Sequence, residues 1–204
     1  MQGVYGLLMR SSGLDESLRD SYQEVFNACL RASYDLPEGV ANVRPSYLNF
    51  KNTVIWGQSV ENGMAAALMT LNSDHGPFSA AFEFIEKFLD KDVAFVQEHA
   101  TIMIVDKVMI PGFGNPVIKT HDDRILPIKD ELSKITDSYR VLSETVEDVF
   151  KSRNLPIFSN LAFWCAAAAH ALKLRKENAS TIPIIGFLLS YTSKIRLWPL
   201  QPSL

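Results

Sequence analysis

The amino-acid sequence predicts an all-α protein, and three observations support this fold class. Apolar residues recur at three- and four-residue spacing through most of the 204 residues, as they do on one face of a helix. No stretch alternates apolar and polar residues in the manner of a half-buried strand. Proline and glycine gather in a few short segments, where helices are expected to end. A chain of this length can bury enough apolar surface to fold as a single domain without a disulfide or metal.

The N-terminal half is expected to contain four helices. The first 35 residues predict one helix with irregular flanks, because apolar residues from Leu14 to Leu30 form a stripe at helical spacing. A loop is expected over residues 35–45, which contain two prolines and a glycine. Three further helices are expected over residues 48–71, 79–89 and 93–105.

The C-terminal half begins with a segment that is not helical. Residues 109–124 contain Pro111, Gly112, Gly114 and Pro116, which predict a loop with unusual backbone angles. Helices are then expected over residues 128–151, with a light break at 136–138, and over residues 161–175 and 182–195.

Composition narrows the classes of function. A formal charge of −3 gives no electrostatic reason to expect a nucleic-acid partner. No apolar run is long enough to span a bilayer, and the apolar stretch near Met1 lacks the basic flank of a signal peptide, so we expect a cytoplasmic protein without a membrane partner. Cys29 and Cys165 form no disulfide framework, and His99 and His121 have no partner at metal-ligand spacing, so no metal site is predicted.

Four segments together resemble a known family. Residues 109–124 resemble the GFGHRVYKxxDPR motif of citrate synthases, with Lys119, Asp122 and Arg124 in register. Residues 65–79 resemble an Ala-rich helix followed by PLHGGAN, residues 159–165 resemble PNVDFYS, and residues 181–189 resemble FTPLFAIAR. The chain is therefore similar to the C-terminal portion of the citrate synthase and citryl-CoA lyase family.

The resemblance also suggests a division of the chain. It covers residues 48–195, whereas the first 45 residues match no family segment. We therefore expect an N-terminal helix and loop over residues 1–45 and a citrate-synthase-like helical domain over residues 46–204, truncated at its N-terminus relative to the family.

The resemblance implies roles for several residues. The family condenses acetyl-CoA with oxaloacetate or cleaves citryl-CoA, and both reactions need a base and a hydrogen-bond donor at a thioester α-carbon. His75 occupies the position of the enol-stabilising histidine, and Arg124 that of a carboxylate-binding arginine. Lys119, with Gly112 and Gly114, falls at the position of a CoA-binding loop.

Three other family positions are substituted. Asn115 stands where the oxaloacetate-binding histidine is expected, Ala162 where the catalytic aspartate is expected, and Leu189 at a carboxylate-binding arginine position. Alanine cannot accept a proton, and loss of a general base alone costs about 10²–10⁴ in rate. Leucine at position 189 cannot form the two parallel hydrogen bonds by which an arginine binds a carboxylate. These substitutions predict that the family reaction is lost.

Each retained residue also has a purely structural interpretation. Gly112 and Gly114 are also expected in a tight turn between helices. His75 can cap a helix junction, and Arg124 can form a surface ion pair with Asp122 or Asp123. Lys119 can simply be solvated.

Three functional hypotheses remain open from the sequence. The first is a non-catalytic or repurposed protein that binds an acyl-CoA or a carboxylate. The second is an active lyase or transferase that makes or breaks a C–C bond beside a CoA thioester of an altered substrate, with coenzyme A as substrate, no tightly bound cofactor, and a nearby aspartate (Asp74, Asp122 or Asp123) as base. The third is a structural or assembly subunit, since the Ala-rich helices at residues 65–67 and 166–169 predict a homodimer.

Overall fold

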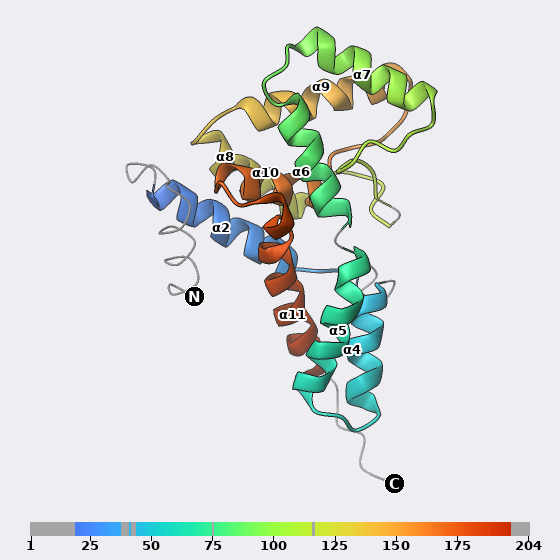
Figure 1. The fold of residues 1–204 in the computed structure, drawn as a ribbon, viewed down its shortest axis with the longest axis vertical. Coiled ribbons are helices and arrows are strands. Elements are labelled where there is room, and N and C mark those ends of the chain that lie inside the picture. Colours follow the sequence, from blue (N-terminus) through green and yellow to red (C-terminus); the bar gives the residue numbers. More distant parts are fainter. Residues whose placement is uncertain (1–18, 38–40, 42–43, 75, 116, 197–204) are drawn as a thin grey trace.

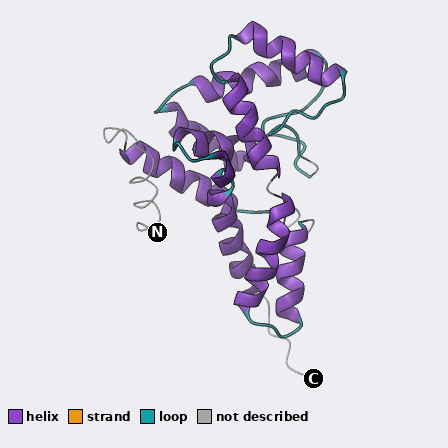
Figure 2. Ribbon diagram, viewed as in Figure 1, coloured by secondary structure: helices purple, strands orange, loops and turns teal. Residues whose placement is uncertain are grey.

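The computed structural model describes residues 19–37, 41, 44–74, 76–115 and 117–196, with the side chains of 71–74, 76, 177 and 195–196 left out. Its helices are α2 (Arg19–Tyr34), α4 (Pro45–Ile55), α5 (Val60–Asp74), α6 (Gly76–Phe88), α7 (Val93–Val105), α8 (Leu126–Ser133), α9 (Ser138–Ser152), α10 (Leu161–Ala171) and α11 (Thr181–Arg196) (Figure 1). Two short 3₁₀ helices, η2 (Asp123–Ile125) and η3 (Lys176–Asn178), lie in the connections. No strand occurs in this part of the chain, so the predicted all-α class is confirmed (Figure 2).

Helix α10 lies at the centre of the core. It packs against α6 on one side and against α2 and α8 on the other. Its four consecutive alanines, residues 166–169, are fully buried within the protomer. Small side chains at these positions let the surrounding helices approach closely, and they leave no alanine of this run on the surface. Residues 166–169 therefore pack within the protomer, and the predicted homodimer stays a prediction.

Helices α4 and α5 form an antiparallel hairpin that extends away from this core beside the lower part of α11 (Figure 1). The predicted single helix over residues 48–71 is wrong, because α4 ends at Ile55 and Gly57 adopts a left-handed conformation with φ of 82°. Gly63 lets the two helices approach, since a Cβ there would lie 2.7 Å from Cγ2 of Val54.

Helices α7 and α9 pack on each other at the opposite end of the molecule (Figure 1). Asp92 caps α7 by accepting a 2.8 Å hydrogen bond from the Phe95 amide. Helix α7 coincides with the expected range, whereas the helix expected over residues 128–151 is two separate helices, α8 and α9, divided at residues 134–137. The helix predicted to reach residue 175 ends at Ala171, since Lys173 has a positive φ of 52°.

The N-terminal helix α2 belongs to the same core as the rest of the protein. It contacts α8, α10 and α11, and its buried residues include Val25, Phe26 and Cys29. Gly186 of α11 makes the α2–α11 contact possible, because a Cβ there would meet Ser33 Cβ at 2.5 Å. The predicted apolar stripe is confirmed from Tyr22 onward, and its earlier members lie outside the described residues. None of the described helices is both long and apolar enough to cross a membrane.

Candidate functional site

Two segments far apart in sequence are joined beside the N-terminus of α10. Phe113 and Ser159 form an isolated antiparallel bridge. The Gly114 amide donates to the Phe158 carbonyl at 2.8 Å, and the Asn160 amide donates to the Gly112 carbonyl at 2.9 Å. These bonds hold the Pro- and Gly-rich loop against residues 158–160, so the two motifs that resemble the family meet in space.

Asn160 fastens this junction with its side chain. Its Oδ1 accepts hydrogen bonds from the amides of Ala162 (2.8 Å) and Phe163 (3.4 Å), which caps α10. Its Nδ2 donates to the Gly114 carbonyl at 2.5 Å. Asn160 was not among the residues singled out from the sequence, although asparagine directly before an apolar helix is a typical N-cap signal.

Gly112 and Gly114 are both in the left-handed region, with φ of 85° and 77°. A Cβ on Gly112 would lie 2.7 Å from Cβ of Phe163, whereas a Cβ on Gly114 would meet nothing closer than 3.6 Å. The loop therefore passes so close to α10 at Gly112 that no side chain fits there. This geometry accounts for the glycine at position 112 without any ligand.

Asn115 uses its side chain to shape the loop. Its Oδ1 accepts hydrogen bonds from the amides of Val117 (2.8 Å) and Ile118 (3.0 Å), which is an Asx-type turn. The exposed Lys119 folds back and donates from Nζ to the Asn115 carbonyl at 3.1 Å. The oxygen of Asn115 is thus engaged with backbone donors at the position where the resemblance implies a ligand-binding histidine.

Arg124 forms a bidentate ion pair with Asp122. Nε donates to Oδ1 at 2.8 Å and Nη2 donates to Oδ2 at 2.6 Å, while Nη1 lies 3.5 Å from the Ala32 carbonyl. The exposed fractions of the Arg124 and Asp122 side chains are 12% and 6%. The predicted ion pair with Asp122 is therefore present, but it lies mostly beneath the surface and not on it; Asp123, by contrast, is exposed.

The remaining predicted site residues are placed as follows. Ala162 lies in the first turn of α10 and is 8% exposed, so a methyl group occupies that position. Leu189 lies on α11 and is 42% exposed. His75 falls outside the described residues, between α5 and α6. Neither Ala162 nor Leu189 lines the cavity beside the loop.

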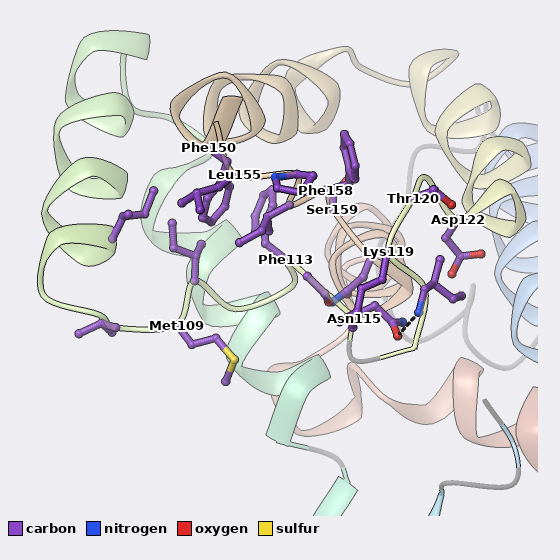
Figure 3. A pocket seen from close by; sticks show the side chains of 18 of the residues that line it. Met109, Phe113, Asn115, Lys119, Thr120, Asp122, Phe150, Leu155, Phe158 and Ser159 are labelled. Atoms are coloured by element: carbon purple, nitrogen blue, oxygen red, sulfur yellow. Dashed lines mark hydrogen bonds between the residues drawn. The ribbon is translucent and has the colours of Figure 1, made fainter. Parts of the chain in front are cut away.

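This cavity has a volume of about 660 Å³ and lies between residues 104–122 and residues 150–160. Of the predicted residues, Gly114, Asn115 and Lys119 line it, together with Asp122. Figure 3 shows Phe113, Phe150 and Leu155 gathered at one end, and Asn115, Lys119, Thr120 and Asp122 at the other. The cavity therefore has an apolar end and a polar end.

A hydrogen-bond network beneath the cavity holds residue 159. Glu147 of α9 accepts at Oε1 from the Ser159 amide (2.9 Å) and from the Ser159 hydroxyl, Oγ (2.6 Å). The same Oγ accepts from Trp164 Nε1 at 2.9 Å. Glu147 thereby ties α9 to the junction. Sequence reasoning missed this residue, because a single glutamate on a polar helix face carries no distinguishing signal.

A second titratable cluster lies away from the cavity. The Tyr139 hydroxyl and His170 Nδ1 are 2.9 Å apart, and the imidazole also packs on the Phe82 ring. Burial lowers the pKa of His170 below its ordinary value, against the opposing effect of Glu86 and Asp90. Burial also raises the pKa of Tyr139, so both groups are neutral near pH 7. We find no group of three or more potential metal ligands among the described residues.

The fold and the junction beside α10 place the protein in the citrate-synthase fold class. It is similar to citryl-CoA lyase from Hydrogenobacter thermophilus, with a TM-score of 0.77 and 20% identity over 96% of this chain and 74% of the lyase. It is also similar to citrate synthase from Thermotoga maritima, with a TM-score of 0.67 and 16% identity over 93% of this chain and 55% of the synthase.

A third similar structure is a citrate synthase from the archaeon Thermoplasma acidophilum, solved in a ternary complex with carboxymethyl coenzyme A and oxaloacetate. The TM-score is 0.57 and the identity 21%, over 88% of this chain and 47% of that one. No sequence-family model and no curated protein sequence matches the chain. The resemblance inferred from short motifs is thus confirmed at the level of the fold. The chain spans about half the length of the two synthases.

Proposed function

We propose that this protein is a non-catalytic or repurposed member of the citrate-synthase fold class that binds an acyl-CoA or a carboxylate without the aldol-type reaction of its structural relatives. The observation that carries the proposal is the methyl group of Ala162 in the first turn of α10. A base at that position would have to remove a proton from a thioester α-carbon, and alanine has no group that can do so.

The neighbouring carboxylates support this proposal because both are already engaged. Each oxygen of Asp122 accepts a hydrogen bond from Arg124. Glu147 accepts two hydrogen bonds from Ser159 at a single oxygen. The same ion pair leaves Arg124 partly neutralised as a receptor for a substrate carboxylate.

The shape and polarity of the cavity support the class of ligand. Its volume of about 660 Å³ is typical of small-molecule sites. Apolar side chains at one end suit an acyl or pantetheine chain, and Lys119 and Lys107 on the lining can attract phosphate or carboxylate groups. Coenzyme A would then be a ligand or part of a substrate, with no tightly bound cofactor.

Calorimetric titration with acetyl-CoA, desulfo-CoA and citrate tests the proposal. We expect binding of at least one of these ligands. Lys119→Ala should raise the Kd of the two CoA ligands about threefold to fivefold, and the effect should be smaller at high salt. Lys134→Ala serves as the matched control, because Lys134 is an exposed lysine at the end of α8 that does not line the cavity. Turnover of citryl-CoA by the purified protein would refute the proposal that the protein is non-catalytic. If none of the three ligands binds at millimolar concentration, the proposal that it binds an acyl-CoA or a carboxylate is refuted.

One observation favours an active enzyme as the second candidate. Asp122 lines the polar end of the cavity, and its carboxylate forms an ion pair with Arg124. On an altered substrate, Asp122 would act as base while Arg124 held a carboxylate. Asp122→Asn and Arg124→Gln would then each abolish turnover against a panel of acyl-CoA compounds. Activity that survives both substitutions would exclude this candidate.

The homodimer remains a proposal, and the α4–α5 hairpin is the surface that favours it. Trp56 and Met69 there are 83% and 81% exposed, and Leu48, Ile55 and Leu68 are also exposed. Large exposed apolar groups indicate an interaction surface. Sedimentation velocity should detect a dimer that Met69→Glu weakens, whereas Val105→Glu on α7 should leave it intact. A monomer at micromolar concentration would refute the dimer.

A further inference from the structure

The two cysteines of the chain meet in the core although 136 positions separate them in sequence. Sγ of Cys29 on α2 lies 3.3 Å from Sγ of Cys165 on α10, and the two thiols form a hydrogen bond. Both residues are fully buried and both are free thiols. The chain contains two cysteines in total, so neither has another partner for an intramolecular disulfide.

The helices that carry the thiols are held in this arrangement by their neighbours. Ser33 donates from Oγ to the Cys29 carbonyl at 2.9 Å and lies 3.9 Å from Sγ of Cys165. Helix α2 is also packed closely against α11, since a Cβ at Gly186 would lie 2.5 Å from Cβ of the same Ser33. A disulfide needs a sulfur–sulfur distance of about 2.05 Å. The two sulfur atoms must therefore approach by about 1.2 Å to form the bond.

We propose that Cys29 and Cys165 are a modification site at which a hydroperoxide forms a reversible disulfide between α2 and α10. One thiol, as its thiolate, attacks the peroxide oxygen, which breaks the O–O bond and yields a sulfenic acid and hydroxide. The second thiolate attacks the sulfenic sulfur, and the hydroxyl group leaves. The sum is two thiols and one hydrogen peroxide converted to one disulfide and two waters. A dithiol reductant reverses the step.

The surroundings make this reaction slow in the native state. The hydrogen bond that the Cys29 thiol donates to Cys165, followed by burial, raises the pKa of Cys29 well above its ordinary value. The nucleophilic thiolate is therefore scarce at neutral pH, and the oxidant must reach a fully buried pair. Oxidation should accelerate as pH rises, and also under conditions that loosen α2. Hydrogen peroxide suits the site because it is small and neutral.

The disulfide would connect the two helices that flank the candidate site. Helix α10 carries Asn160 and Ala162 at its N-terminal end, and the Ala32 carbonyl of α2 lies 3.5 Å from Nη1 of Arg124. A cross-link between residues 29 and 165 closes a long loop, which restricts the unfolded chain strongly. The inference stands on the thiol geometry and does not depend on the proposed function.

To test this, the reduced and folded wild-type protein is treated with hydrogen peroxide at pH 7 and at pH 9. Thiols are then counted with a chromogenic disulfide reagent in guanidinium chloride. We expect two thiols before oxidation and none after it, a mass loss of two hydrogens, and a peptide that joins Cys29 to Cys165. The melting temperature should rise by about 10 °C and return on treatment with dithiothreitol.

Two variants act as controls. Cys29→Ala and Cys165→Ala should each show no mass loss and no rise in melting temperature under the same conditions. The proposal is overturned if the cysteines of the wild type gain oxygen without forming a cross-link. It is also overturned if the wild type keeps both thiols when it is treated with peroxide in subdenaturing urea. A cross-link between two chains in place of the internal one would also overturn it. Each of these readouts is made on the wild type, so the proposal stays testable even if a variant fails to fold.

Discussion

The side-chain amide of Asn160 joins the start of α10 to the carbonyl of Gly114, in the loop that resembles the catalytic loop of citrate synthases. Its oxygen simultaneously caps α10. This side chain therefore adds to the backbone hydrogen bonds that hold the loop against the start of the helix. This relationship gives the first prediction.

Asn160→Ala should destabilise the protein by about 2–3 kcal/mol, because it removes a helix cap and leaves the Gly114 carbonyl without this partner. Asn160→Asp keeps the cap but loses the donor, so it should recover part of the loss. Urea unfolding measures both, with Asn178→Ala at the exposed η3 as the control. Equal stabilities for the Asp variant and the wild type would show that the bond to Gly114 contributes nothing, and equal stabilities for the Ala and Asp variants would show the same of the cap.

Gly112 and Gly57 can be compared to measure how much the close approach of the loop to α10 destabilises a variant with a side chain at position 112. Both have a positive φ, of 85° and 82°, but a Cβ meets Phe163 at 2.7 Å only at Gly112 and nothing within 4 Å at Gly57. Gly57→Ala should therefore cost about 1–2 kcal/mol from its backbone alone. Gly112→Ala should cost that and a further ~1–3 kcal/mol from the clash. Similar losses in thermal unfolding for the two variants would contradict the close approach to α10.

The Asp122–Arg124 pair should behave as a buried ion pair. Arg124→Gln leaves the Asp122 carboxylate buried without its charged partner, which typically costs about 3–5 kcal/mol. The double variant Asp122→Asn/Arg124→Gln should be less destabilised than Arg124→Gln alone, since no unpaired charge remains. A double-mutant cycle in urea measures the coupling. Additive effects would mean that the two side chains do not interact.

The burial of His170 beside Tyr139 should make stability depend on pH. The pKa of His170 is lowered in the folded state, so the unfolded chain binds the proton more readily. Stability should therefore fall as pH drops below about 6.5, until the folded pKa is passed, and should be regained as pH rises. His170→Gln should flatten the profile between pH 5 and pH 7, whereas His121→Gln at an exposed position should leave it unchanged. Urea unfolding at a series of pH values provides the measurement, and a slope unaffected by His170→Gln would contradict the assignment.

Much of the fold could be predicted from local patterns. The three- and four-residue spacing of apolar side chains placed helices near all those observed, because burial of one face dictates that spacing. Errors concentrated at breaks such as Gly57, where one residue ends a helix inside an otherwise continuous pattern. For the site, the sequence indicated the loop that bears Gly112, Gly114 and Asn115, and also the start of α10. It did not indicate Glu147, nor the bond from Asn160 to Gly114, because both depend on partners in other elements.

By itself the sequence determined the helical class, the Pro- and Gly-rich loop and the residue types at Asn115, Ala162 and Leu189, since each is a local property of the chain. Only the tertiary structure decided that Arg124 is paired with Asp122 in a buried position, that the Ala166–Ala169 run faces inward, and that Cys29 meets Cys165. The physical reason is that hydrogen bonds, ion pairs and thiol contacts act over a few ångströms in space. Sequence periodicity reports which face of a helix is buried but not which residue of another helix lies against it.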